Sequence, residues 1–213
     1  ANITLRDVTT TGTQLFTASG TIDTNSTYTS DGANITFAGA TVANSALTID
    51  TGAAGGHVLF TSTLDSEASE GNMLTIRAGT GNITFTGAAG AAEDGSGNNI
   101  GRLGAIVINS AADITANSIT AASLDQLSGT GTTTFNGAVD MNGVVTRPDN
   151  DTYAISIVSD KLAVNSTITT TSATGGADVE FYLGSQIDIA AAGDITADGA
   201  VLMTASSTGV INT

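Results

Sequence analysis

Short runs of alternating apolar and polar positions recur along the whole chain. Most runs set two branched or aromatic side chains two positions apart, which is the pattern of a half-buried strand. Segments rich in Gly, Asn or Asp separate the runs, and no segment carries the apolar stripe of a helix. The sequence therefore predicts an all-β fold. The alternating pairs are Ile3/Leu5, Ile35/Phe37, Leu47/Ile49, Val58/Phe60, Leu74/Ile76, Ile83/Phe85, Ile106/Ile108, Ile155/Ile157, Val179/Phe181, Ile187/Ile189 and Val201/Met203.

One strand–turn–strand phrase is repeated. Leu47-Thr-Ile-Asp-Thr-Gly returns as Leu74-Thr-Ile-Arg-Ala-Gly, and a looser copy begins at Leu124. In a parallel β-helix, successive turns of the chain lie about 4.8 Å apart, so stacked residues share an environment and tend to be alike. The repetition favours this fold, with residues 1–213 forming a single elongated β-solenoid.

A shorter motif supports the same prediction. Ile-Thr-Phe or Thr-Thr-Phe occurs three times, ending at Phe37, Phe85 and Phe135. We expect these three phenylalanines at equivalent inward positions of stacked turns. Strands of a sandwich have no comparable reason to resemble one another.

An antiparallel, pilin-like β-sandwich is the alternative fold. Asn-Gly and Asp-Gly dipeptides favour two-residue hairpins between antiparallel strands. Four such dipeptides lie between the apolar runs, at Asp31-Gly32, Asn136-Gly137, Asn142-Gly143 and Asp198-Gly199.

Three segments interrupt the strand pattern. Residues 65–72 and 88–101 are rich in Gly, Ala and acidic residues and are predicted to be inserted loops. The third segment, 147–152, contains the only proline, Pro148. A junction between two blocks of the solenoid near 144–152 is the alternative to one continuous unit.

The charge balance excludes some partners. Acidic residues outnumber basic ones by 20 to 5, which gives a formal net charge of −15. The scattered cations cannot form the clustered patch that displaces counterions from nucleic acid, and an anionic membrane surface would repel the chain. No run reaches the roughly 18 apolar residues of a membrane-spanning helix. We expect neither nucleic-acid binding nor membrane insertion.

The chain has no cysteine and is rich in Thr, Asn and Gly. Disulfides, thiolate metal sites and cysteine nucleophiles are thereby excluded. This composition is typical of exported bacterial surface proteins, so we expect an extracellular location. The chain begins Ala-Asn-Ile-Thr-Leu without the pattern of a leader, so a signal peptide is expected to be removed or to lie upstream.

Candidate catalytic groups are few, and we expect no enzymatic activity. His57 is the only histidine and lies in a predicted turn, which does not support a catalytic triad or a zinc site. Carboxylates are numerous enough for paired-acid glycoside hydrolysis. The five scattered cations nevertheless suit an acidic polysaccharide poorly, and an aromatic content of 4% offers few platforms for sugars.

Calcium is the one metal that the sequence supports. This ion takes about six to eight carboxylate and carbonyl oxygens, often from loops. Asp149 and Asp151 lie in a predicted loop and are the candidate ligands, and the acidic loops at 65–67 and 93–94 are similar. No cofactor is otherwise required.

The repeats resemble those of a known family. Leu-Thr-Ile-Arg-Ala-Gly-Thr-Gly-Asn-Ile-Thr-Phe-Thr-Gly-Ala (74–88) and Gly129-Thr-Gly-Thr-Thr-Thr-Phe-Asn-Gly-Ala-Val are similar to repeats of giant bacterial surface proteins related to filamentous haemagglutinins. The likeness covers 34–140 well and 150–213 more loosely. It implies a right-handed parallel β-helix, export across the outer membrane and a role in adhesion, biofilm or surface coating. The family's Asn-Pro-Asn export signatures are absent, so the resemblance implies a shaft segment.

These observations favour a non-enzymatic extracellular structural protein. We expect a self-assembling or rod-forming segment of a bacterial surface filament, surface layer or adhesin, whose partner is another copy joined head to tail through open strand edges. Three alternatives stay open. They are an adhesin that binds glycans or a host surface through its loops, a donor-strand pilin subunit, and a polysaccharide-degrading β-helix enzyme.

Overall fold

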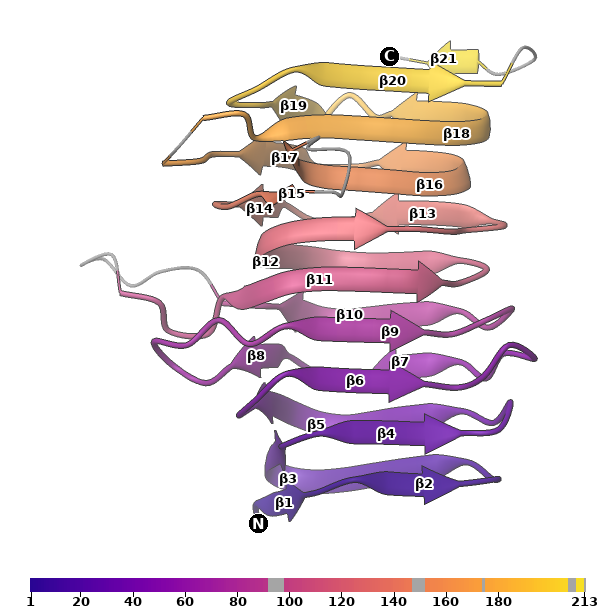
Figure 1. Cartoon of the computed structure of the whole chain (residues 1–213), viewed down its shortest axis with the longest axis vertical. Coiled ribbons are helices and arrows are strands. Elements are labelled where there is room, and N and C mark those ends of the chain that lie inside the picture. Colours follow the sequence, from indigo (N-terminus) through magenta and orange to yellow (C-terminus); the bar gives the residue numbers. More distant parts are fainter. Residues whose placement is uncertain (92–97, 147–151, 174, 207–209, 213) are drawn as a thin grey trace.

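The computed structural model of the chain is built from strands (Figure 1). It describes residues 1–91, 98–146, 152–173 and 175–206, together with the backbone of 210–212. No helix occurs in these segments, and all 21 strands belong to one hydrogen-bonded sheet system. The all-β prediction is confirmed.

Most strands are short, because each covers only one side of the molecule before the chain turns. Their bounds are β1 (Ile3–Leu5), β2 (Val8–Thr10), β3 (Gln14–Thr24), β4 (Thr27–Ser30), β5 (Ile35–Ala43), β6 (Leu47–Asp50), β7 (Val58–Phe60), β8 (Leu64–Ser66), β9 (Leu74–Arg77), β10 (Ile83–Ala89), β11 (Leu103–Ser110), β12 (Ile114–Gln126), β13 (Thr132–Phe135), β14 (Val139–Met141), β15 (Val145–Thr146), β16 (Thr152–Val164), β17 (Thr167–Thr170), β18 (Asp178–Ile189), β19 (Asp194–Thr196), β20 (Val201–Ala205) and β21 (Val210–Asn212).

The pairings form three parallel ladders. Ladder 1 joins β1, β3, β5, β8, β10, β12, β14, β17 and β19 in that order. Ladder 2 joins β2, β4, β6, β9, β11, β12, β16, β18 and β20. Ladder 3 joins β3, β5, β7, β10, β12, β13, β16, β18 and β21.

The chain visits the three ladders in turn and repeats this circuit, and we call each circuit a level. The longer strands serve more than one ladder, because they continue around a corner. In β3, for example, residues 14–17 pair on ladder 3 and residues 21–24 on ladder 1. Figure 1 shows the levels stacked along the long axis, with the N-terminus at one end and the C-terminus at the other.

The repeated phrase lies in register, as the sequence predicted. On ladder 2, Leu47 pairs with Leu74 and Ile49 with Ile76. Two levels further along the same ladder, Leu124 occupies the position of Leu74. Like residues therefore lie above like residues because parallel pairing gives them the same surroundings.

The phenylalanines of the shorter motif also share one position. Phe37, Phe85 and Phe135 lie on ladder 3 at equivalent places and are at most 1% exposed. Phe60 lies between the first two, and its ring stacks on Phe37 at 4.9 Å and on Phe85 at 5.4 Å between ring centroids. Below them, Phe16 contacts Phe37 at 5.2 Å. The aromatic rings thus form a continuous inward column through four levels.

The antiparallel sandwich was the wrong alternative. Every strand pairing in the described segments is parallel except β15–β16. The Asx-Gly dipeptides turn the chain onto the next ladder instead of closing a hairpin. Gly32, for example, has a left-handed φ of 76° between β4 and β5, and these two strands pair with different partners.

The described residues in and next to the three predicted interruptions lie at one corner, where the chain passes from ladder 1 to ladder 2. The segments between strands are slightly shorter than predicted, because β8 and β10 each extend two residues into the predicted loops. They run over 67–73 and 90–102 instead of 65–72 and 88–101. We call their described residues, 67–73, 90–91 and 98–102, the loop pair. Figure 1 shows these residues at one edge of the molecule.

Residues 144–146 and 152, on the two sides of the third interruption, also lie at this corner. Here β15 pairs antiparallel with the start of β16, through Val145 with Tyr153 and Thr146 with Thr152. Parallel pairings of β12 and β13 with β16, and of β14 with β17, span this position. One cluster of buried apolar side chains includes Met141 before it and Ile155 after it.

Candidate functional site

The loop pair is one structural unit, although the sequence showed two separate loops. The backbone N–H of Ser69 donates to the carbonyl of Asn99 at 3.0 Å, and that of Ser66 donates to Gly101 at 2.9 Å. Ser69 has a φ of 71°, the one positive value among the described non-glycine residues. Such a backbone costs of order 1–3 kcal/mol and persists only where its surroundings hold it, and the hydrogen bond to Asn99 is one contact that holds it here.

Arg102 fastens the loop pair to the levels above it. Its Nη1 donates to the carbonyls of Ala121 at 2.9 Å and Asp140 at 3.1 Å, and its Nη2 lies 2.7 Å from Asp140 Oδ2. The Arg102 side chain is 8% exposed, whereas that of Asp140 is 41% exposed. A buried guanidinium is costly unless its charge is paired and its donors are bonded. These contacts pair the charge and bond the donors of Nη1 and Nη2.

Asp65 lies beneath the same unit, on the outer side of ladder 1. Gly101 packs against it so closely that a Cβ there would come within 3.1 Å of the Asp65 Cβ. Burial raises the pKa of the Asp65 carboxyl, although a hydrogen bond with the Thr63 side chain acts in the opposite direction. The loop pair therefore contributes to the burial that raises the pKa of this carboxyl.

Two large apolar side chains project from the loop pair. Met73 is 44% exposed and Ile100 is 49% exposed, and the acidic residues Glu67 and Glu70 are exposed beside them. A single exposed apolar residue needs no explanation. Here two such residues lie on the loop pair, which defined hydrogen bonds hold in place. This arrangement suits the loop pair for contact with a partner.

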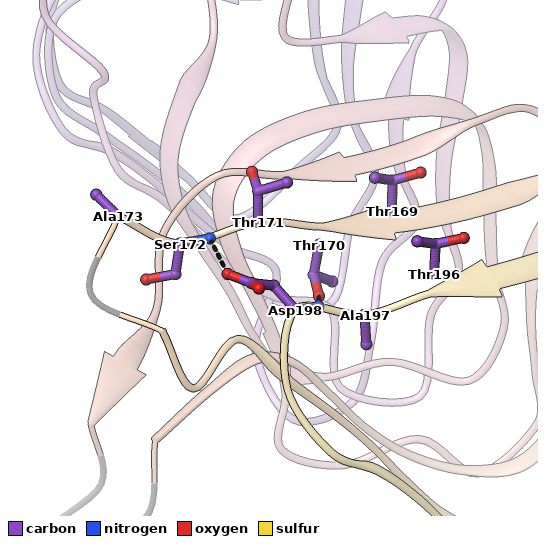
Figure 2. Close-up of a pocket in the computed structure, with 8 residues that line it drawn as sticks. All are labelled: Thr169, Thr170, Thr171, Ser172, Ala173, Thr196, Ala197 and Asp198. Atoms are coloured by element: carbon purple, nitrogen blue, oxygen red, sulfur yellow. Dashed lines mark hydrogen bonds between the residues drawn. The ribbon is translucent and has the colours of Figure 1, made fainter.

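The hollow in Figure 2 lies at the same corner, nearer the C-terminus. It measures about 490 Å³ and is lined by Thr169, Thr170, Thr171, Ser172, Ala173, Thr196, Ala197 and Asp198. Asp198 is its one carboxylate. It accepts a hydrogen bond from the Ser172 N–H at 3.2 Å, and its own N–H donates to Thr170 Oγ1 at 3.3 Å. The carboxylate therefore holds two levels together and has no second acid beside it.

Two further hollows lie where the chain passes from ladder 2 to ladder 3. One contains the ion pair between Arg77 and Asp50 at 3.4 Å, among threonine hydroxyls of β2 and β4. The other is lined by Tyr182, Asp160 and residues near them. Both pair members in the first hollow are partly exposed, so this contact contributes at most about 1 kcal/mol.

Two nearly buried carboxylates lie on the outer side of ladder 2. Asp125 is 8% exposed and Glu180 is 6% exposed, and both are in register with the fully buried Ser156 between them. The hydroxyl of Tyr153 donates to Asp125 at 2.8 Å, and that of Tyr182 donates to Glu180 at 3.3 Å. Neither carboxylate lines any of the three hollows. Both carboxylates are therefore largely covered in the described structure.

His57 occupies a turn, as predicted, and belongs to a series of hydrogen bonds between levels. The carboxamide oxygen of Asn34 accepts from the His57 N–H at 2.8 Å, and His57 Nδ1 accepts from the Asn82 N–H at 3.0 Å. Asn82 and Asp113 continue the series to the next levels. We call these four residues the acceptor series. The imidazole thus replaces an Asn or Asp side chain as an acceptor, which is a structural role.

The predicted calcium ligands Asp149 and Asp151 lie outside the described residues, as do Glu93 and Asp94. Within the described part of the chain, no group of three or more His, Cys, Asp or Glu side chains is placed to hold a metal ion. The calcium prediction stays a prediction.

The first and last levels have open strand edges. Each of β1 and β2, and the ladder-3 part of β3, pairs only with the level above it. Each of β19, β20 and β21 pairs only with the level below it. One side of each strand therefore presents backbone N–H and C=O groups that no described strand pairs.

Comparisons with known proteins give no relative. No protein-family model, curated protein or solved structure matches the chain. In addition, the described segments contain no helix that is long and apolar enough to cross a membrane. The functional assignment therefore depends on the geometry of the chain's own residues.

Sequence reasoning missed the Arg102–Asp140 contact and the Tyr153–Asp125 contact. Their partners are 38 and 28 residues apart, so no local pattern joins them. The one available signal was the position of Arg102 directly before an apolar run, at the end of a predicted loop. That signal marks a loop end and does not identify the partner.

Proposed function

We propose that this chain is a right-handed parallel β-helix, and that it is a rod-forming structural segment of a bacterial surface filament, surface layer or adhesin. In this proposal it acts outside the cell and has no enzymatic activity. The single observation that carries the proposal is the set of three parallel ladders that end in open strand edges.

Open edges favour growth by addition of further levels. An unpaired strand edge is a template for another strand, and head-to-tail contact of unlike ends is not closed by symmetry, so it gives filaments. In the proposed assembly, β19, β20 and β21 of one copy pair with β1, β2 and β3 of the next. Where a polypeptide continues beyond these strands, its own levels would occupy the same edges.

The test compares two lysine substitutions on β2. Val8 points inward at the open end, so Val8→Lys places an ammonium group where the next copy would bury it. Thr9→Lys adds the same charge on the outer side of the same strand and is the matched control. We expect wild type and Thr9→Lys to form rods in negative-stain images, and Val8→Lys to form only short particles.

Two results would contradict the proposal. Wild-type protein that stays monomeric at high concentration, with or without Ca²⁺, would exclude self-assembly. Rods of equal length from Val8→Lys and wild type would exclude the open end as the contact.

The loop pair supports a second candidate function, an adhesin that binds glycans or a host surface. The observation that favours it is the exposure of Met73 and Ile100 on a unit that Arg102 fastens to the rod. The double variant Met73→Ser/Ile100→Ser should lose attachment to glycan arrays and epithelial cells. Leu127→Ser removes a similarly exposed side chain elsewhere (46%) and should keep attachment. Equal attachment of the two variants would exclude this function for the loop pair.

A further inference from the structure

The outer side of ladder 3 is almost free of charge. One outward residue per level lies between two buried residues, and these outward residues are in register. From the first level to the seventh they are Leu15, Thr36, Leu59, Thr84, Thr115, Thr134 and Ala163. Asp188 follows at the eighth level. We call this row and the residues that flank it the ladder-3 face.

The flanking residues are mainly amides and hydroxyls. On one side lie Thr17, Ala38, Thr61, Thr86, Asn117, Asn136 and Asn165, which directly follow the strand positions. Asn165 Nδ2 donates to Asn136 Oδ1 at 3.0 Å across adjacent levels. On the other side lies the acceptor series, followed by Thr132 and Lys161. Through the first seven levels, Asp113 is the only acidic residue of the ladder-3 face and Lys161 the only basic one, so their charges balance.

The carboxylates lie mainly elsewhere on the molecule. The outward row of ladder 1 includes Asp23, Asp65 and Asp140, and the corner between ladders 1 and 2 adds the exposed Glu67 and Glu70. On ladder 2, Asp50 is paired with Arg77, whereas Asp125 and Glu180 are nearly buried. The formal net charge of −15 therefore lies mainly outside the ladder-3 face, which carries no net charge through its first seven levels.

The ladder-3 face is also unobstructed. The loop pair and the β15–β16 hairpin lie at the corner between ladders 1 and 2, which is the corner opposite this face. The described structure exposes 8700 Å² in total. One of its three sides is therefore large compared with the about 800 Å² that one partner contributes to an interface of standard size.

We propose that the ladder-3 face packs side by side against the same face of a second copy of this chain. Two molecules of strong negative charge repel one another, and this is the side on which they can approach with few carboxylates facing one another. A self-complementary contact of this kind has twofold symmetry and closes as a dimer. The contact goes beyond the proposed function, because it is lateral and does not use the strand edges.

Two pairs of half-buried threonines are used to test the contact. Thr84 and Thr115 lie in the middle of the ladder-3 face, whereas Thr48 and Thr75 lie outward on ladder 2 at neighbouring levels. The variants Thr84→Glu/Thr115→Glu and Thr48→Glu/Thr75→Glu change the net charge equally. Both are made with Val8→Lys, which blocks head-to-tail growth. Dimerisation is measured by analytical ultracentrifugation, folding by circular dichroism, and the cross-section of the particle by small-angle X-ray scattering.

We expect the Val8→Lys parent to form dimers of increased cross-section. The Thr84→Glu/Thr115→Glu variant should weaken dimerisation by about a hundredfold or more, because like charges facing one another across an interface cost several kcal/mol. The Thr48→Glu/Thr75→Glu variant should dimerise nearly as well as the parent.

Three results would overturn the proposal. Monomers at all concentrations and salt levels, from both the Val8→Lys parent and wild type, would exclude the dimer. Equal loss in the two glutamate variants would show a general effect of charge. Monomeric protein that is retained on microcrystalline cellulose, and released by Thr84→Glu/Thr115→Glu, would assign the face to a neutral polysaccharide instead. A failure of head-to-tail growth in wild type would leave the lateral dimer intact, so the two proposals fail separately.

Discussion

The lower levels of the molecule, from β1 to β11, bury a column of aromatic rings on the inner side of the ladders. The upper levels, from β12 to β20, also bury polar side chains on the outer side of a ladder. In the lower levels, four phenylalanine rings stack inward, and Tyr28 makes edge contacts with Phe16 and Phe37 at 5.3 Å. Burial raises the pKa of Tyr28 to about 12. The ring column ends where Ala116 pairs above Phe85.

In the upper levels, the outer side of ladder 2 carries the covered residues Asp125, Ser156 and Glu180. The parallel pairing is the same in both regions, so the backbone ladder does not depend on which side of the strand is buried. The difference indicates two sources of stability on one backbone plan. Dispersion and apolar burial dominate below, and matched polar groups contribute above.

The largest expected effect is loss of a ring from the lower column. Phe60→Ala removes a side chain that is 1% exposed and lies between two rings, so it should destabilise by about 3–5 kcal/mol. Phe135→Ala, in the upper levels, removes an equally buried ring outside the column. It should cost about 1–3 kcal/mol less, because Phe60 makes two aromatic pairs and each contributes about 0.5–1.5 kcal/mol beyond its buried area. Urea unfolding followed by circular dichroism measures both variants, and equal costs would argue against a role for the stacking.

A smaller effect is expected for the contact that joins the two regions. Arg102→Ala removes charge-assisted hydrogen bonds to the carbonyls of Ala121 and Asp140 and the ion pair with Asp140, so we expect a loss of about 2–3 kcal/mol. Arg77→Ala breaks a partly exposed pair with Asp50 and should cost about 0–1 kcal/mol. Thermal unfolding compares the two variants. Similar losses of thermal stability in both variants would show that the burial of Arg102 adds nothing to the strength of its contacts.

Next comes the covered polar group of the upper levels. Tyr153→Phe keeps the buried ring and removes the donor to Asp125, so it should cost about 1–3 kcal/mol. Tyr182→Phe removes a longer hydrogen bond, at 3.3 Å, from a partly exposed ring and should cost less. The urea midpoints of the two variants provide the comparison. A larger loss from Tyr182→Phe would reverse the assignment of the stronger bond.

The smallest effects concern two carboxyls of the lower levels, whose pKa shifts have opposite signs. Burial raises the pKa of Asp65, so its favourable contribution is present below the ordinary pKa and is lost as the pH rises through the raised value. Hydrogen bonds from the Ser26 side chain and the Thr27 N–H lower the pKa of Asp7. Its contribution is therefore present above the ordinary pKa and is lost as the pH falls through the lowered value.

These signs predict opposite results for two asparagine variants. Asp65→Asn should be more stable than wild type at neutral pH, and this gain should shrink in acid. Asp7→Asn should be less stable than wild type at neutral pH, and this loss should shrink in acid. Thermal unfolding across acidic and neutral pH measures both, and a shift of the same sign in the two variants would contradict the environments described for them.

The inward rows were predictable from the sequence, because period-two alternation and repetition report local burial directly. Leu47, Leu74 and Leu124 share one position for that reason, as do Phe37, Phe85 and Phe135. The assignment of the interruptions to one corner was not predictable. Corner position depends on how many strands precede a loop, and strands such as β12 turn a corner without an intervening loop. The partners of Arg102 were also hidden, since Ala121 lies one circuit and Asp140 two circuits further along the chain.

The acceptor series has a consequence for how such a chain tolerates length changes. Asn34, His57, Asn82 and Asp113 each meet the backbone of the next level at one fixed residue, so an extra residue directly after any of them would misalign the bond. The corner between ladders 1 and 2 already accommodates connections of very different length. Foreign peptides grafted into that corner would be displayed in a single file along one edge, with the opposite side of the scaffold undisturbed.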